Sequence, residues 1–142
     1  MTTMRVIRRA EMSNSAPAPG LMEFAAGKDA GTQGLWLARI TAAPGSGVSP
    51  VHHHRESEAL VYVLSGTLTF VFGPELRERV DVDAGDFLFI PPRTLHAEAN
   101  LGLVPAEVVM ARSTPEPLTE NHRELRVPAE LLYPVAGAQR PG

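Results

Sequence analysis

The chain has 142 residues, of which 44% are hydrophobic and 20% are charged, a composition typical of one globular domain with a sizeable core. Its formal net charge of −3 argues against nucleic acid as a partner, because proteins that bind the phosphate backbone are usually basic. The absence of cysteine excludes disulfide scaffolds, thiolate metal sites, iron–sulfur clusters and thiol nucleophiles.

The first 34 residues are weakly patterned. Proline and glycine in the segments 16–20 and 31–34 interrupt any regular helix, so residues 1–34 are expected to form an arm that lies on the body of the domain. No apolar stretch of signal-peptide length follows the basic N-terminus. The longest apolar run, Ala59 to Leu64, is far shorter than the ~20 residues that span a bilayer. We therefore expect a cytoplasmic protein without membrane contact.

Short apolar segments separated by turn residues begin at Leu35 and continue to Arg112. Their spacing of roughly 8 to 12 residues predicts an all-β sandwich or small barrel over residues 35–112. After Ser113, five prolines predict an extended C-terminal tail over residues 113–142, with one helical turn near Ala129–Leu132. The expected strands are 35–41, 58–64, 67–72, 77–82, 87–90, 95–100 and 106–112.

The strand expected over 58–64 is apolar on both faces. Glu58, Leu60, Tyr62 and Leu64 share the face expected to point inward, because successive side chains alternate across a strand. The opposite face is apolar as well, since it carries Ala59, Val61 and Val63. It is therefore expected to be covered by a second sheet, by the arm or by a partner subunit.

Four of the five histidines lie in two places, at His52-His53-His54 and at His96. In an extended segment His52 and His54 point the same way, and Glu58 follows at the head of the next strand. A carboxylate buried without a partner is costly, whereas a divalent cation would satisfy it together with neutral imidazoles. The alternative is that these histidines form an exposed polar loop; their clustering favours a metal site.

These residues resemble the two motifs of the cupin family. The first motif is matched by Gly47, His52, His54, Glu58 and Gly66, with gaps of four, one, three and seven residues. Two of these gaps, the one before His52 and the one before Gly66, differ by one residue from the common form. The second motif is matched at every gap by Gly85, Pro91, His96 and Asn100, but Arg93 stands where the family usually has glycine.

The resemblance implies a cupin-like double-stranded β-helix, a small jelly-roll barrel, that assembles as a homodimer. It also implies one divalent metal ion per chain (Fe, Mn, Ni, Zn, Co or Cu), held by His52, His54, Glu58 and His96 with two positions open to water or ligand. Cupins of this kind include dioxygenases, decarboxylases, isomerases and cyclases, and their ligands are small oxygen-rich molecules.

Two further residues are candidates for a catalytic role beside the metal. Tyr62 shares a strand face with Glu58, and Glu98 lies two residues after His96, where it can act as a general acid or base. Two functional hypotheses follow. The first is a metalloenzyme acting on a small oxygenated metabolite; the second is a non-catalytic binding or sensing protein with a structural metal.

Overall fold

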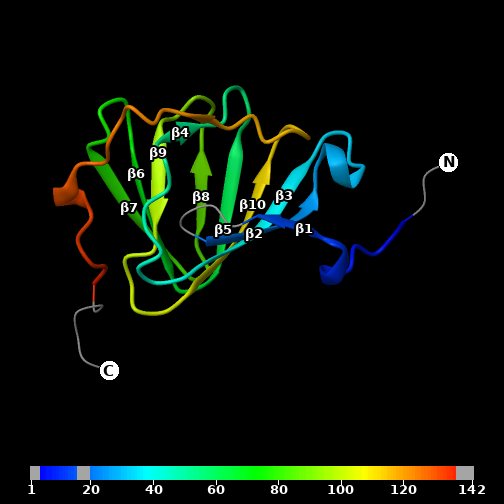
Figure 1. Ribbon diagram of the computed structural model, residues 1–142, viewed down its shortest axis with the longest axis horizontal. Coiled ribbons are helices and arrows are strands. Elements are labelled where there is room, and N and C mark those ends of the chain that lie inside the picture. The colour runs from blue at the N-terminus through cyan, green and yellow to red at the C-terminus, as the bar shows by residue number, and fades with distance from the viewer. Residues whose placement is uncertain (1–3, 16–19, 137–142) are drawn as a thin grey trace.

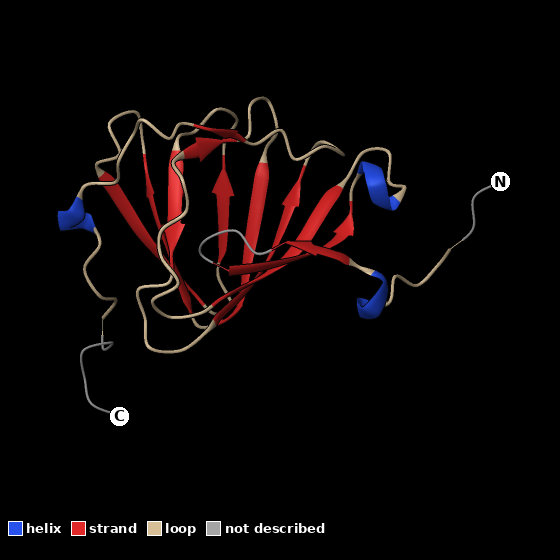
Figure 2. Cartoon of the chain, viewed as in Figure 1, coloured by secondary structure: helices blue, strands red, loops and turns tan. Residues whose placement is uncertain are grey.

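The computed structural model describes residues 4–15 and 20–136, and two antiparallel β-sheets dominate this part of the chain (Figures 1 and 2). The six-stranded sheet has the order β1-β2-β3-β10-β5-β8, and the five-stranded sheet has the order β11-β4-β9-β6-β7. The strands of the first sheet are β1 (Ser13–Ser15), β2 (Gly20–Ala26), β3 (Trp36–Ala42), β5 (Ala59–Ser65), β8 (Phe87–Ile90) and β10 (Ala106–Arg112). Those of the second sheet are β4 (His52–His53), β6 (Thr67–Phe72), β7 (Glu78–Asp83), β9 (His96–Ala99) and β11 (Glu120–Asn121). The short 3₁₀ helices are η1 (Arg9–Glu11), η2 (Lys28–Ala30) and η3 (Ala129–Leu131).

The all-β jelly-roll prediction is confirmed, and each of the seven predicted strands lies within one residue of the observed one at both ends. A glycine makes the turn between β5 and β6, which lie in different sheets. Gly66 adopts φ +74°, and a Cβ at this position would clash with the carbonyl oxygen of Pro105. This close approach fixes where β5 ends, and therefore which of its side chains point inward.

The main core lies between the two sheets. The six-stranded sheet contributes alternate residues of β3, β5 and β10, and the five-stranded sheet contributes Leu68, Phe70 and Val82. In β5 the buried residues are Ala59, Val61 and Val63, whereas Leu60 and Leu64 are exposed. The expectation that the even-numbered face of β5 points inward is therefore wrong. The odd-numbered face lies against the second sheet, which is one of the covers expected for it.

The N-terminal segment extends the six-stranded sheet. β2 pairs antiparallel with β3, and β1 pairs with β2. Figure 1 shows these strands, in blue, below the label of β3, where they form one edge of the sheet. Arg9 reinforces this end, because its guanidinium lies 2.8 Å from the carboxylate of Glu23 on β2.

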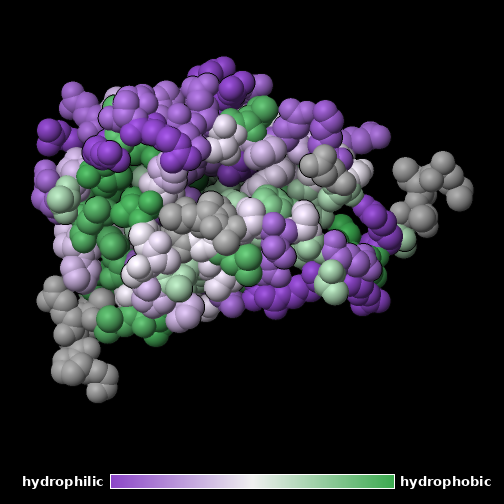
Figure 3. All heavy atoms as spheres, viewed as in Figure 1, coloured by the Kyte–Doolittle hydropathy of each residue, from purple (hydrophilic) through white to green (hydrophobic). Residues whose placement is uncertain are grey.

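The C-terminal segment packs on the outer face of the five-stranded sheet. β11 pairs with β4, and a second apolar cluster forms where the tail passes over Val71 and Ala97. Leu125, Val127 and Leu131 supply the tail's share of this cluster. Hydrophobic surface gathers on this half of the molecule in Figure 3, beside the hydrophilic loops of the upper edge. The tail thus supports the strands β4 and β9, which carry three of the four clustered histidines.

None of the helices in the described part of the chain has the length and apolar character needed to cross a bilayer.

Candidate metal centre

Three histidines converge at one end of the five-stranded sheet. His52 lies on β4 directly opposite His96 on β9, and His54 follows β4 by one residue. The ring centroid of His96 lies 4.3 Å from that of His52 and 4.9 Å from that of His54. All three residues are buried, and each can offer a nitrogen within 4.8 Å of the others. The predicted convergence of these histidines is thus present in the structure.

The hydrogen bonds of two of these rings leave their Nε2 atoms free. His52 Nδ1 lies 2.7 Å from the carbonyl oxygen of Pro50, and His96 Nδ1 lies 2.8 Å from that of Thr94. A carbonyl oxygen only accepts, so each Nδ1 carries the proton and each Nε2 keeps its lone pair. A carbonyl that fixes the tautomer and orients the ring is the usual support of a metal-binding histidine.

Burial keeps the rings of His54 and His96 neutral. Loss of solvation, followed by the charge of Arg112 and of the neighbouring histidines, lowers the pKa of His54 far below its ordinary value. Burial, followed by the charge of His52, lowers the pKa of His96 to about 4. Both nitrogens of His54 and Nε2 of His96 are buried without a hydrogen-bond partner. Neutral, unpartnered imidazole nitrogens facing one another are what a divalent cation requires, so the residues fit a metal ion.

A carboxylate faces two of the three rings. Glu98 lies on β9 two residues after His96, on the same face of the strand, and its Oε2 is 3.9 Å from Nε2 of His96. The same oxygen is 3.9 Å from Nε2 of His52. Both separations are too long for a hydrogen bond, and Oε2 is buried without a partner. Glu98 is therefore the acidic group of this cluster.

The structure does not bring Glu58 or Tyr62 into the cluster. Glu58 is exposed just before β5, and its backbone N–H donates to Ser113 Oγ. Tyr62 lies on the outer face of β5, with its ring centroid 4.6 Å from that of Phe87. The reason is strand parity, because the inward-facing position next to Glu58 is occupied by Ala59. Of the four predicted ligands, the structure brings the three histidines together and leaves Glu58 outside, and the carboxylate beside the histidines is that of Glu98.

Sequence reasoning missed a buried arginine. Arg112, the last residue of β10, is 4% exposed and its guanidinium lies 4.2 Å from the centre of the Trp36 ring. Its Nη1 donates to the carbonyl oxygen of Pro117 and to Thr119 Oγ1. Burial lowers the pKa of Arg112 to about 10, which still leaves it charged near neutral pH, and Glu98 opposes this shift. Arg112 thus ties the tail to the barrel and adds a positive charge within reach of Glu98 and His54.

Replacing Arg112 by alanine is expected to lower the free energy of unfolding by about 3 kcal/mol, because a desolvated cation–π contact and two charged hydrogen bonds are lost. Urea denaturation measures this change. The control is Arg39→Ala on β3, since Arg39 is one-third exposed and its ion pair with Glu107 should contribute at most about 1 kcal/mol. Equal losses in the two variants would contradict the anchoring role of Arg112.

A second group of histidines lies on the outer side of β4. Glu120 Oε2 of β11 is 3.0 Å from His53 Nε2 and 3.2 Å from His122 Nε2. His53 Nδ1 accepts a hydrogen bond from the backbone N–H of Arg55, so the ring proton of neutral His53 is on Nε2, facing Glu120. That tautomer suits an interaction with the carboxylate rather than with a cation, so this group holds β11 against β4.

The turn before His96 is preserved although glycine is replaced. Arg93 adopts φ +60°, the left-handed conformation that glycine adopts readily, and its N–H donates to the carbonyl oxygen of Arg55. This conformation costs an arginine about 1 kcal/mol. The departure from the usual motif thus leaves the position of His96 intact.

Comparison with known proteins identifies relatives of this arrangement. The profile of the cupin domain matches residues 38–112. Germin-like protein 5-1 of Oryza sativa subsp. japonica is 35% identical over 92 residues, which are 63% of this chain and 41% of that protein. Nectarin-1 of Nicotiana plumbaginifolia is 33% identical over 92 residues, again 63% of this chain and 40% of that protein. The chain therefore spans about two-fifths of the length of these relatives.

Solved structures share the fold at low sequence identity. Oxalate decarboxylase of Lactobacillus farciminis superimposes with a TM-score of 0.69 at 21% identity, covering 79% of this chain and 34% of that chain. A polyketide cyclase of Streptomyces resistomycificus superimposes with a TM-score of 0.68 at 21% identity, covering 90% and 92%. Oxalate decarboxylase of Bacillus subtilis, described with Mn(II) centres, gives a TM-score of 0.70 at 18% identity, covering 80% and 31%.

Proposed function

The chain belongs to the cupin family, and from this premise we propose that it is a metal-dependent enzyme acting on a small molecule with adjacent oxygen atoms. One divalent ion per chain would be held by His52, His54 and His96. The observation that carries the proposal is the set of buried imidazole nitrogens and one carboxylate oxygen that face one another without partners. A bound divalent ion would act as a Lewis acid on the oxygen atoms of the substrate.

The chain's own residues would orient the metal ligands and transfer the proton. The carbonyl oxygens of Pro50 and Thr94 hold the rings of His52 and His96 in one orientation. Glu98 is the acid–base group, positioned to take a proton from a carbon beside a carbonyl and to return it at another atom. Isomerisations and cyclisations require such a transfer. Two solved structures with the same fold are named as enzymes, an oxalate decarboxylase and a polyketide cyclase, which supports an enzyme over a binding protein.

The alternative is a binding or sensing protein whose metal is structural. A structural site uses all its positions for protein ligands and needs no carboxylate left free for proton transfer. Glu98, whose Oε2 is buried without a hydrogen-bond partner, favours the enzyme.

Elemental analysis of the protein purified without chelator tests the metal centre. About one equivalent of Mn, Fe, Ni, Co, Cu or Zn per chain is expected. A chain that stays metal-free after incubation with each of these ions in turn would overturn the proposal.

We also propose that a second copy of the chain covers the outer face of β5 and β8. Large apolar side chains lie side by side there, because Leu60 pairs with Phe89 and Tyr62 with Phe87. Phe87 and Phe89 are 64% and 53% exposed. A contiguous apolar patch of this kind is typical of an interface between protein subunits.

The double variant Leu60→Glu/Phe87→Glu is expected to weaken such a dimer at least a hundredfold, because two central apolar contacts become buried charges. Sedimentation equilibrium should then report the 15.3 kDa monomer. Leu103→Glu, at an exposed leucine elsewhere, serves as the control and should remain dimeric. A wild-type protein that is monomeric at high micromolar concentration would refute the dimer.

A further inference from the structure

A cavity opens beside the metal centre, between the edges of the two sheets. β8 ends the six-stranded sheet and β7 ends the five-stranded sheet, so no strand of the described residues closes the seam between them. The cavity in this seam has a volume of about 330 Å³ and extends along β6 to His96. Its volume is at the small end of the range for ligand pockets, which suits a molecule of one or two rings.

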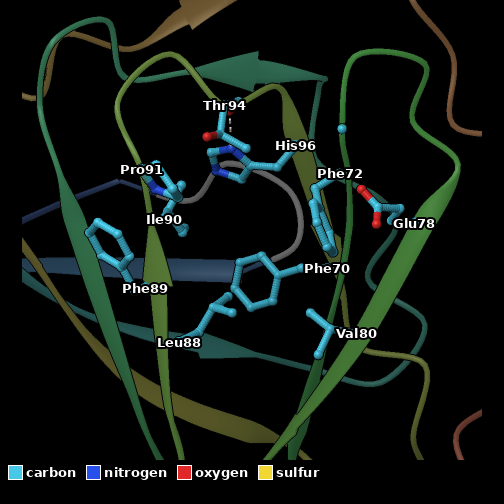
Figure 4. A pocket seen from close by; sticks show the side chains of 11 residues that line it. Phe70, Phe72, Glu78, Val80, Leu88, Phe89, Ile90, Pro91, Thr94 and His96 are labelled. Atoms are coloured by element: carbon cyan, nitrogen blue, oxygen red, sulfur yellow. Dashed lines mark hydrogen bonds between the residues drawn. The ribbon is translucent and has the colours of Figure 1, made fainter.

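Most of the side chains around this cavity are apolar. Phe70 and Phe72 come from β6, Val80 from β7, and Leu88 and Ile90 from β8. Figure 4 shows the rings of Phe70 and Phe72 and the side chains of Leu88 and Val80 around one space, with His96 at its upper end. Among the lining residues no side chain carries a positive charge, and Glu78 is the acidic one. The cavity is therefore poorly suited to the body of a small dianion such as oxalate, which would lose its hydration without gaining a cationic partner.

The cavity and the metal centre share His96. The ring of His96 lies 6.3 Å from that of Phe70 at the cavity end, and its Nε2 lies 3.9 Å from Glu98 Oε2 at the other. A molecule in the cavity would thus have its apolar body between Phe70 and Leu88. Its end near His96 would meet the polar groups of the metal centre.

We propose that the ligand of this protein is a one- or two-ring aromatic molecule whose oxygen atoms lie at one end. The inference rests on the proposed function for the role of that oxygen-bearing end, whereas the apolar part of the argument stands on the cavity alone. Each ring of the ligand that leaves water and packs against these side chains strengthens binding in proportion to the apolar area that it buries. Small polar chelators are correspondingly poor ligands.

Binding to the metal-free protein tests the cavity separately from the metal. 2-Naphthol and phenol differ by one ring, and neither chelates a cation. Isothermal titration calorimetry is expected to show that 2-naphthol binds at least about tenfold more tightly than phenol. Val80→Phe, which fills the cavity, should weaken 2-naphthol binding at least tenfold. The matched control is Leu64→Phe on the exposed outer face of β5, which should leave the affinity unchanged.

Binding to the metal-loaded protein tests the oxygen-bearing end. 2,3-Dihydroxynaphthalene should bind more tightly than catechol, and catechol more tightly than oxalate, with the metal content unchanged after the titration. Oxalate binding as tightly as the naphthalene diol would overturn the inference and leave the metal centre standing. A chain that binds 2-naphthol in the cavity but no metal would overturn the proposed function and uphold the aromatic ligand. Thermal unfolding verifies that wild type and Val80→Phe are both folded. Equal binding of 2-naphthol by these two proteins would overturn the inference. Leu88→Phe repeats the test from the opposite side of the cavity.

Discussion

Changing His52 and His96 together to alanine is expected to abolish stoichiometric metal binding. The two residues face each other across β4 and β9, and both direct an unprotonated Nε2 at the same space. Their loss leaves one of the three imidazoles, that of His54, and one imidazole does not hold a divalent ion at micromolar concentration. Wild-type protein with metal at a hundred times its dissociation constant should gain about 2.7 kcal/mol of stability, and the variant should gain none.

The matched control for this variant is His53→Ala/His122→Ala. It removes two histidines from neighbouring segments, but these rings lie on the outer side of β4 against Glu120. Elemental analysis and metal-dependent thermal unfolding should be unchanged in the control. One equivalent of metal retained by His52→Ala/His96→Ala would refute the ligand assignment.

Glu98→Gln is expected to slow catalysed proton transfer by about 10²- to 10⁴-fold while the metal remains bound, because glutamine keeps the shape of the side chain but cannot accept a proton. A suitable reporter is 2-tetralone, a two-ring ketone with exchangeable protons beside its carbonyl. Deuterium incorporation from D₂O at that carbon, followed by NMR, measures the transfer.

Glu58→Gln is the control for Glu98→Gln, since the same chemical change is made at an exposed carboxylate six residues after His52. It should alter neither exchange nor metal content. Loss of metal from Glu98→Gln would make Glu98 a ligand instead of the acid–base group. Loss of metal from Glu58→Gln would restore the ligand set that the sequence motif implies.

The contrast between these two glutamates shows what the sequence could predict. The histidine spacing placed three rings together correctly, because their positions follow from two short strands and a turn. The gap between Glu58 and Gly66 is one residue longer than the common form, and one residue reverses the face on which a side chain lies. Since Gly66 must sit against Pro105, counting back from it places Ala59, not Glu58, inside. The extra residue between Glu58 and Gly66 was therefore the sign in the sequence that Glu58 points outward.

Other features depend on contacts between distant segments. The strands β4 and β11 are two residues long, and no hydrophobic alternation marks so short an element. In the sequence, Arg112 is typical of the polar end of a strand. Its burial follows only from its contacts with Trp36 and with the folded C-terminal tail. The apolar cavity likewise forms only when the edges of both sheets are in place. The sequence therefore predicted a small oxygen-rich ligand but gave no sign that part of this ligand is apolar.

The position of β10 between β3 and β5 has a consequence for how the chain is made. A growing polypeptide presents β3 and β5 long before residues 106–112 exist, and until then each of these strands has an open edge toward the gap. The sheet can be completed only after residue 112 has been synthesised. Pairings between such distant segments form slowly, and open apolar edges invite association with other chains. The nascent protein is therefore expected to need protection by a chaperone until its last long strand is released.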